Sequence, residues 1–425
     1  MFVDREEELA LLERLYASGR PQLVLIYGRR RVGKTWLVKR FLEGKRGLYF
    51  YARRRPLRDE LADLAESLGK VLDRYVRPDW DSIFAALRDA GRFVLAVDEF
   101  GYWLDEDPGT LSAIQRGWDE YLSDSGAFLV LLSSAVAVAE RAVSYGGGLF
   151  GRATARLRLG PLAPRYAKSF LPAYSPRDLA VAYAVANGIP YYLALFDGGK
   201  DLGENLNALF SRWGPLYEEA ENLLRYEARE PHIYLNIVRA IEEGASTYSE
   251  IAERARISPQ TLAKYLHVLE KLEIVRREAP VLGKARPIYV VSDLYVKFWT
   301  RFVYPQRGWI ELGNPPAFDL EGYMGSAFEE IVRRALPYLH KAGVVKRLGR
   351  CGRYWSGDVE VDIVCVDGGR ITAVEVKWSD LDEDDVERIL EETKDKLGRR
   401  EGDYYVAARS GPKDPRVITA DRIFA

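Results

Sequence analysis

Residues 23–42 read LVLIYGRRRVGKTWLVKRFL and indicate the fold of this chain more strongly than any other segment. It reads as a buried strand over 23–27, a glycine-containing loop over 28–35 and a helix over 36–42. The loop matches G-x-x-x-x-G-K-[ST], a pattern in which backbone N–H groups and a helix N-terminus hold the phosphates of a nucleotide. Since the strand, loop and helix come in the order that this pattern requires, the sequence predicts an α/β fold built on a parallel sheet.

Each position of the loop has an expected role. Gly28 and Gly33 let the backbone curl around the phosphates, Lys34 reaches the β- and γ-phosphates, and Thr35 ligates Mg²⁺. The arginines at the variable positions either add charge near the triphosphate, or one or two of them are solvated or contact another domain. We therefore predict ATP and Mg as cofactors. The residues expected to bind the nucleotide are Gly28, Arg29, Arg30, Arg31, Val32, Gly33, Lys34, Thr35 and Trp36.

A second apolar run, RFVLAVDE over 92–99, ends in two carboxylates. Ligands of α/β sheets bind at the carboxyl ends of the strands, so Asp98 is expected in the Mg²⁺ shell and Glu99 beside the attacking water. An acid next to the metal ligand favours hydrolysis over transfer to another substrate. A third run over 128–132 ends in Ser133 and Ser134, which either sense the γ-phosphate or form a turn or helix cap.

Bulk properties exclude several classes of protein. The chain has 425 residues, a net charge of −1, 48% hydrophobic and 29% charged residues, so nothing global indicates a nucleic-acid partner. Neither Cys351 nor Cys365 belongs to a CxxC pair, and we expect no disulfide framework or structural zinc. The most apolar stretch, 127–139, is too short to span a bilayer, and the N-terminus lacks a signal-peptide core. We expect a cytoplasmic protein without membrane contact.

Several further segments resemble the archaeal-type ATPases of the AAA+/STAND group of P-loop NTPases. The opening FVDREEEL over 2–9 looks like that family's entry segment, LFGR over 149–152 resembles its YGR element, and NGIPYYL over 187–193 resembles its GG.P.YL motif. By this resemblance Arg152 contacts the γ-phosphate of its own subunit or acts on a neighbouring subunit. The second alternative would require an oligomer, which the sequence does not exclude. The resemblance also places Pro190 near the nucleotide.

The middle of the chain reads as a helix-turn-helix with a wing. Helices are expected over 232–243, 247–255 and from the Ser258 cap onward, followed by two short strands over 274–277 and 287–291. The third helix has a leucine stripe, and Gln260, Thr261, Lys264, Tyr265 and Lys271 are expected to face outward. DNA is the expected partner, although protein contacts alone are the alternative. The segment after this module resembles the family's DP.l.FW motif, and we interpret it as packing.

The last hundred residues carry a second candidate site. Elements expected over 324–339, 344–348, 359–366, 371–377, 382–397 and 404–409 give the order αβββαβ of PD-(D/E)XK nucleases. A two-residue turn at Gly368 and Gly369 would place Asp362 opposite Glu375, and Lys377 on the same face. Mg²⁺ would relieve the repulsion between the carboxylates, with Lys377 orienting the nucleophile and Glu329 as a further ligand. The alternative is a degenerate nuclease fold whose acids pair with Lys377.

Together these features predict a P-loop NTPase core over 1–160, a helical lid over 161–230, a winged helix over 231–305 and a small α/β PD-(D/E)XK-like domain over 315–425. The expected activity is an ATPase that gates a DNA-binding winged helix and a Mg-dependent nuclease-like domain. One alternative is a nucleotide-switched transcription regulator with a silent C-terminal site. Another is a non-catalytic, ATP-dependent scaffold or sensor.

Overall fold

A computed structural model describes residues 3–227 and 230–425, which form two compact units, 1–160 and 161–425. The first two residues of the expected entry segment, Met1 and Phe2, lie outside the described residues. So do Ala228 and Arg229, at the end of the expected lid. In the described part of the chain no helix is both long and apolar enough to cross a membrane.

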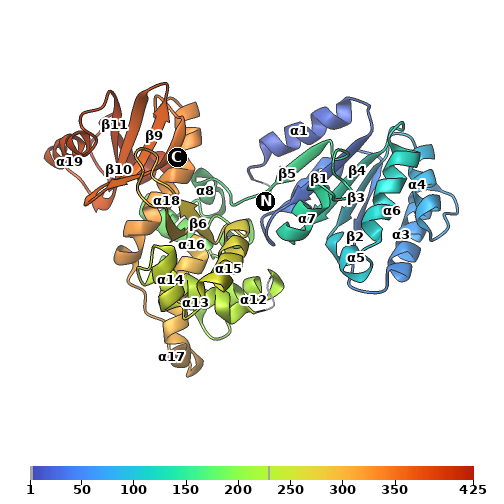
Figure 1. The fold of residues 1–425 in the computed structure, drawn as a ribbon, viewed down its shortest axis with the longest axis horizontal. Coiled ribbons are helices and arrows are strands. Elements are labelled where there is room, and N and C mark those ends of the chain that lie inside the picture. Colours follow the sequence, from blue (N-terminus) through green and yellow to red (C-terminus); the bar gives the residue numbers. More distant parts are fainter. Residues whose placement is uncertain (1–2, 228–229) are drawn as a thin grey trace. The chain divides into compact units, whose positions relative to one another are not determined.

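A five-stranded parallel sheet forms the centre of the first unit (Figure 1). Its strands are β1 (Gln22–Tyr27), β2 (Gly47–Tyr51), β3 (Val94–Asp98), β4 (Phe128–Ser133) and β5 (Ala155–Arg158), in the order β2-β3-β4-β1-β5. All residues of β3 and β4 are buried, as a parallel sheet covered on both faces requires. The phosphate-loop strand β1 and the acidic strand β3 are thus both neighbours of β4, and their carboxyl ends lie at one edge.

Helices cover both faces of this sheet. The helical elements of this unit are α1 (Glu6–Ala17), α2 (Lys34–Leu42), α3 (Leu57–Leu72), α4 (Trp80–Asp89), α5 (Gly101–Glu106), α6 (Thr110–Gly117), the π-helix η1 (Trp118–Leu122) and α7 (Val136–Val143). Leu23 and Leu25 of β1 face a core built with α3 and α4. Phe128 packs instead against Phe41 of α2 and Tyr16 of α1, with ring centroids 5.2 and 6.0 Å apart.

The second unit begins with short helices. These are η2 (Pro164–Tyr166), α8 (Ala167–Phe170), α9 (Pro176–Ala186), α10 (Pro190–Leu193), α11 (Leu202–Phe210) and α12 (Glu219–Glu227). The expected three-helix module follows as α13 (Pro231–Glu242), α14 (Tyr248–Arg254) and α15 (Pro259–Lys271), with the antiparallel hairpin β6 (Val275–Glu278) and β7 (Ile288–Val291). Thr247 and Ser258 cap α14 and α15 as predicted.

One detail of this module differs from the expectation. Tyr265 is buried, not outward-facing, because its ring packs on Tyr234 and its hydroxyl donates to Glu230 at 2.6 Å. The loop after β6 is docked on the C-terminal sheet: the Val281 N–H donates to the Arg353 carbonyl at 3.0 Å, and Arg350 donates to the Val281 carbonyl at 3.0 Å. The hairpin is therefore anchored to the C-terminal sheet of the same unit.

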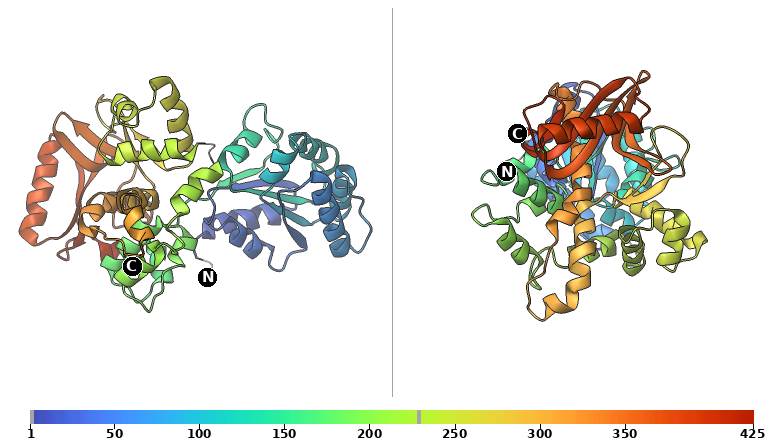
Figure 2. Two further views of the ribbon diagram at one scale, coloured as in Figure 1. Left: turned by 90° about the horizontal axis from the view of Figure 1, so that it is seen from below. Right: turned by 90° about the vertical axis from the view of Figure 1, so that its left-hand side faces the viewer.

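A linking segment connects the hairpin to the C-terminal sheet. It comprises α16 (Leu294–Phe298), η3 (Trp299–Val303), η4 (Tyr304–Gln306), α17 (Arg307–Glu311) and the long α18 (Leu320–Lys341). The sheet contains β8 (Arg350–Ser356), β9 (Val359–Asp367), β10 (Arg370–Asp380), β11 (Gly402–Ser410) and β12 (Val417–Thr419), in the order β12-β11-β10-β9-β8. Helix α19 (Glu383–Lys396) covers one face and α18 the other, and α20 (Ala420–Phe424) ends the chain (Figure 2).

The predicted strand over 344–348 is wrong. In this stretch the main chain bonds side chains instead of a neighbouring strand: the Lys346 N–H donates to the Tyr405 hydroxyl at 3.1 Å, and Thr372 donates to the Arg347 carbonyl at 3.0 Å. The first strand of the sheet is β8, whose polar sequence gave no strand pattern. Strand β12 and helix α20 were not predicted.

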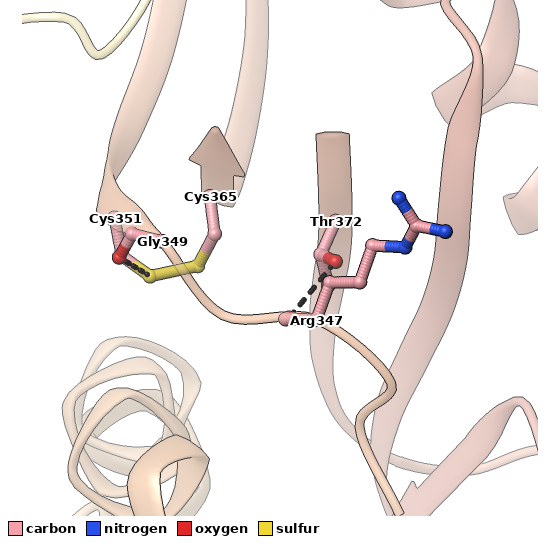
Figure 3. Close-up of a disulfide and its surroundings, with 5 residues drawn as sticks. All are labelled: Arg347, Gly349, Cys351, Cys365 and Thr372. Atoms are coloured by element: carbon pink, nitrogen blue, oxygen red, sulfur yellow. Dashed lines mark hydrogen bonds between the residues drawn. A yellow bond between two sulfur atoms is a disulfide. The ribbon is translucent and has the colours of Figure 1, made fainter. Parts of the chain in front are cut away.

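The expectation that the two cysteines form no disulfide framework is also wrong. Strands β8 and β9 pair in a register that places Cys351 directly opposite Cys365, and the two form a disulfide (Figure 3). The 14-residue separation gave no motif because the bond depends on the register of the strands.

Candidate functional site

The phosphate-type loop connects β1 to α2 with three residues in the left-handed region. These are Gly28, Arg31 and Gly33, with φ of 149°, 70° and 98°. A side chain at Gly28 is excluded because a Cβ there would lie 2.2 Å from the carbonyl oxygen of Leu159. The first glycine of the motif is therefore required by a close backbone approach as well as by its φ.

Lys34 is buried at the start of α2. Its Nζ donates to the carbonyl oxygens of Gly28 and Arg29, at 2.8 and 3.0 Å, and to the Ser134 hydroxyl at 2.8 Å. The ammonium group thus bonds the main chain of the loop whose N–H groups would donate to a phosphate.

Thr35 and Asp98 lie side by side at the carboxyl ends of the strands. The Thr35 hydroxyl donates to Asp98 Oδ2 at 2.6 Å, and the Tyr49 hydroxyl donates to the same oxygen at 2.7 Å. Burial, and then the Asp98 carboxylate, raise the pKa of Tyr49. A hydroxyl and a carboxylate held together are the oxygen donors that Mg²⁺ prefers, so these residues fit the expected ion. Sequence reasoning missed Tyr49, which no motif marks.

Ser134 joins Lys34 to Glu99. Its N–H donates to Glu99 Oε2 at 3.1 Å, and its hydroxyl donates to Oε1. Glu99 itself has a left-handed φ of 58°, a conformation uncommon for a residue with a side chain. Of the two serines that the sequence left open, Ser133 forms a turn with Ala135, while Ser134 lies among the candidate catalytic groups.

The remaining residues of the loop point in different directions. Arg29 is buried, Arg30 donates to the Tyr102 hydroxyl at 2.9 Å, and Arg31 is exposed. The Val32 carbonyl accepts a hydrogen bond from Arg5 at 3.1 Å. Trp36 is 63% exposed at the first turn of α2.

Arg152 forms a two-pronged pair with Asp119 of η1. Its Nε and one terminal nitrogen donate to the two carboxylate oxygens at 2.7 and 2.6 Å. This pairing raises the pKa of Arg152 and lowers that of Asp119. A contact between Arg152 and a phosphate would require this pair to open. Pro190 is the first residue of α10 in the second unit, and its expected role at the nucleotide stays a prediction.

Asn187 occupies the first glycine position of the NGIPYYL motif and has a left-handed φ of 53°. Its amide donates to Asp293 at 2.9 Å, and its Oδ1 accepts from the Leu294 N–H and from Arg334 at 3.1 and 2.9 Å. Asp293 in turn caps α16 by accepting from the Val296 N–H. The motif and the DP.l.FW-like segment are thus parts of one buried polar cluster, which agrees with the packing interpretation.

In the C-terminal sheet, the predicted turn and register are present. Asp367 pairs with Arg370, and this antiparallel ladder continues to Val374 opposite Ile363. Asp362 then interrupts the ladder, since its Oδ2 accepts from the Val376 N–H at 2.8 Å. A register shift between β8 and β9 occurs at the same point, and such bulges re-aim side chains.

Glu375 is buried between two lysines. Its Oε1 accepts from Lys377 and from Lys396, both at 3.0 Å, whereas its Oε2 is buried without a hydrogen-bond partner in the described part of the chain. Burial, the largest single effect, opposes the charge of Lys377, but the surrounding acids Glu375, Asp362 and Glu329 together raise the pKa of the lysine. Burial, then Glu375, also raise the pKa of Asp362. Lys396 was missed because it comes from α19, which had no motif.

Glu329 forms an ion pair with Arg353 of β8 instead of completing a cluster with Asp362 and Glu375. Arg353 also donates to Glu360 at 2.5 Å, and its Nε lies 3.7 Å from Oε2 of Glu278 in β6. Burial, and then Asp362, raise the pKa of Glu329 to about 7, against the opposing effect of Arg353.

The three expected metal ligands are thus not gathered together. Within 3–227 and 230–425, no group of three or more His, Cys, Asp and Glu side chains is arranged to hold a metal ion. The structure brings Asp362, Glu375 and Lys377 together and leaves Glu329 on Arg353. The unpartnered Glu375 oxygen is the feature that fits a cation.

Comparison with known proteins agrees with this architecture. A family model described as an ATPase domain predominantly from Archaea matches residues 2–196, and one described as Archaea bacterial proteins of unknown function matches 299–389. The Walker-type ATPase paby2304 of Pyrococcus abyssi superposes with a TM-score of 0.55 at 22% identity. The match covers 71% of this chain and 96% of that one, and it shows a shared fold.

Two relatives come from Methanocaldococcus jannaschii. The uncharacterized ATP-binding protein MJ0423 is 56% identical over 46 residues, 11% of this chain and 78% of the relative. The uncharacterized protein MJECL04 is 31% identical over 404 residues, 92% of this chain and 90% of the relative. This chain therefore belongs to one family with MJECL04, and its residues 2–196 carry the ATPase domain found predominantly in Archaea.

Proposed function

We propose that this protein binds ATP with Mg²⁺ and hydrolyses it. The observation that carries the proposal is the convergence of Lys34, the Thr35–Asp98 pair and Glu99 at one edge of the parallel sheet. The archaeal ATPase domain matched over 2–196 supports it. A Mg²⁺ ion bound by Thr35 and Asp98 would neutralise phosphate charge.

The chain's own residues account for binding and for proton transfer. Lys34 exchanges its carbonyl and hydroxyl acceptors for phosphate oxygens, which carry more negative charge and bind the ammonium more strongly. Ser134 donates one hydrogen bond to each oxygen of Glu99, and each oxygen keeps a further lone pair that can accept a proton from the attacking water. Because Lys34 also contacts Ser134, this serine links the phosphate-binding ammonium group to the candidate base.

The test of this proposal is Glu99→Gln. The amide cannot accept the proton of the attacking water, so we expect ATP affinity within about threefold of wild type and hydrolysis reduced by roughly 10²-fold or more. Calorimetric titration and phosphate release measure the two quantities. Glu106→Gln, which changes an exposed acid at the end of α5, is the control. Normal turnover in Glu99→Gln would remove Glu99 as the base.

We propose further that the nucleotide state gates DNA binding by α13–α15 and a Mg-dependent, nuclease-like site at Asp362, Glu375 and Lys377. The unpartnered oxygen of Glu375 beside a second carboxylate favours this site. Gln260, Thr261 and Lys264 of α15 are exposed and available to DNA. The docked loop after β6 argues that any DNA contact is made mainly through α15.

A cleavage assay separates this proposal from its alternatives. With Mg²⁺ present, we expect cleavage of DNA to be lost in Asp362→Ala and kept in Ser258→Ala, which removes only the cap of α15. Sequence-specific binding without cleavage would instead identify a nucleotide-switched regulator. The absence of both activities would leave an ATP-dependent scaffold or sensor.

A further inference from the structure

Arg5 connects the phosphate-type loop to the end of the first unit. Its guanidinium is almost fully buried, and one terminal nitrogen donates both to the Val32 carbonyl, at 3.1 Å, and to the Gly160 carbonyl, at 2.5 Å. Val32 lies inside the loop, and Gly160 is the last residue of the first unit. One buried cation therefore fixes two backbone segments that are far apart in the sequence.

The backbone around Arg5 is shaped for this contact. Asp4 and Arg5 are consecutive non-glycine residues with left-handed φ of 60° and 82°. The Asp4 carboxylate accepts from the Arg5 N–H at 2.8 Å, and Glu8 accepts from the guanidinium at 3.3 Å. Two adjacent residues in this region are unfavourable unless their surroundings hold them, so these contacts stabilise the position of the guanidinium.

The same end of the chain touches the loop a second time. Leu159, the residue before Gly160, lies so close to Gly28 that no side chain fits there. Its N–H donates to the Tyr27 carbonyl at the end of β1. A shift of the loop thus bears on Leu159 directly and on Gly160 through Arg5.

Beyond Gly160 the chain is fixed again within two residues. In the second unit, the Leu162 N–H donates to the Gly188 carbonyl at 2.8 Å, and the Leu162 carbonyl accepts from the Tyr183 hydroxyl at 2.7 Å. Gly188 follows Asn187, the centre of the buried polar cluster described above. Only Pro161 separates the two fixed positions, and its ring restricts φ.

We propose that Arg5 is a positioning residue that transmits the state of the phosphate loop through Gly160, Pro161 and Leu162 to the Gly188 segment. This inference rests on the proposed ATP site and says how a change at that site would reach the second unit. When phosphate binding changes the loop at Val32, Arg5 carries the change to the Gly160 carbonyl. The short, proline-restricted connection passes it to the residues that hold Leu162.

The test measures nucleotide affinity and transmission separately in the full chain. Hydrogen exchange is followed in peptides covering 22–35, 157–165 and 183–193, with and without a non-hydrolysable ATP analogue and Mg²⁺. In wild type we expect the analogue to slow exchange in all three regions. In Arg5→Gln we expect affinity within about fivefold of wild type and a response confined to 22–35.

Three further variants keep the test decisive. Arg14→Gln changes an exposed arginine of α1 and should respond like wild type. Arg5→Lys should respond partially, since an ammonium group keeps the charge without the guanidinium geometry. Pro161→Gly leaves every Arg5 contact in place but frees the connection, and it should uncouple 183–193 even if Arg5→Gln folds poorly.

The outcomes are distinguishable. An undiminished response at 183–193 in Arg5→Gln or in Pro161→Gly overturns the proposal. So does a wild-type response that stops at residue 35. Failure of wild type to bind the analogue at all would instead contradict the proposed ATP site.

Discussion

Among single residues, the buried acids of the C-terminal sheet differ in their partners. Glu375 accepts from two lysines, Lys377 and Lys396, whereas Glu329 pairs with Arg353. Burial is the first cause that raises the pKa values of Glu329 and Asp362. The charge of Glu329 therefore depends on pH near neutrality, where most carboxylates are fully ionised.

Glu329 makes stability depend on pH. In the folded chain its pKa is about 7, against an ordinary value of 4.5, so between these values the folded state holds a proton that the unfolded state has lost. The free energy of unfolding therefore falls as pH rises through this window, by at most on the order of 3 kcal/mol for this group. The raised pKa of Asp362 acts in the same direction.

Urea unfolding of wild type and Glu329→Gln at pH 5, 6, 7 and 8 checks this expectation. The variant lacks the titrating group, so its decline over the window should be smaller. Glu383→Gln, an exposed acid at the start of α19, is the control and should follow wild type. Equal slopes in wild type and Glu329→Gln would show that Glu329 titrates normally in the folded protein.

At the scale of elements, local sequence signals predicted what depends on local physics. The loop at Gly28–Thr35, the caps Thr247 and Ser258 and the turn at Gly368 are short-range patterns, and all are present. Strand β8 has no apolar alternation, and its position depends on pairing with β9. The first strand of this sheet was therefore predicted at 344–348, before its actual position. Tyr265 was misplaced because helix periodicity does not indicate a partner such as Tyr234.

The candidate sites follow the same division. Spacing predicted the turn and the register as far as Val374 opposite Ile363, and Lys377 does bond Glu375. The hydrogen bond from the Val376 N–H to Asp362 was not predicted. Contacts between distant elements were not predictable. They are the hydrogen bonds that Arg5 donates to Val32, Ser134 to Glu99 and Lys396 to Glu375, and the ion pair of Arg353 with Glu329. Each of these contacts depends on how elements pack, which no motif encodes.

The β8–β9 disulfide provides a test at this scale. A bond that closes a loop of this size is expected to stabilise its unit by about 3 kcal/mol, chiefly by restricting the unfolded chain. Reduction should therefore lower the urea midpoint of wild type. The double variant Cys351→Ser, Cys365→Ser should unfold at the lower urea midpoint, and its midpoint should not change when reductant is added. Identical midpoints for oxidised and reduced wild type would show that the bond contributes nothing.

At the scale of the whole molecule, two units are joined by a connection of a few residues. The first carries the ATPase domain, and the second combines three helices, a hairpin and the C-terminal sheet. Within the second unit the docking of Val281 on β8 and the ion pairs of Arg353 tie the hairpin to that sheet. The covalent connection between Gly160 and Leu162 is one route by which nucleotide bound to the first unit can act on the second.

Calorimetric titration of Mg-ATP into the full chain tests whether the loop at Gly28–Thr35 binds ATP. Wild type should bind at one site per chain. Lys34→Ala, which removes the buried ammonium group, should bind at least tenfold more weakly, while Lys70→Ala, which changes an exposed lysine of α3, should match wild type. No binding by wild type, or equal affinity in Lys34→Ala, would rule out ATP binding at this loop.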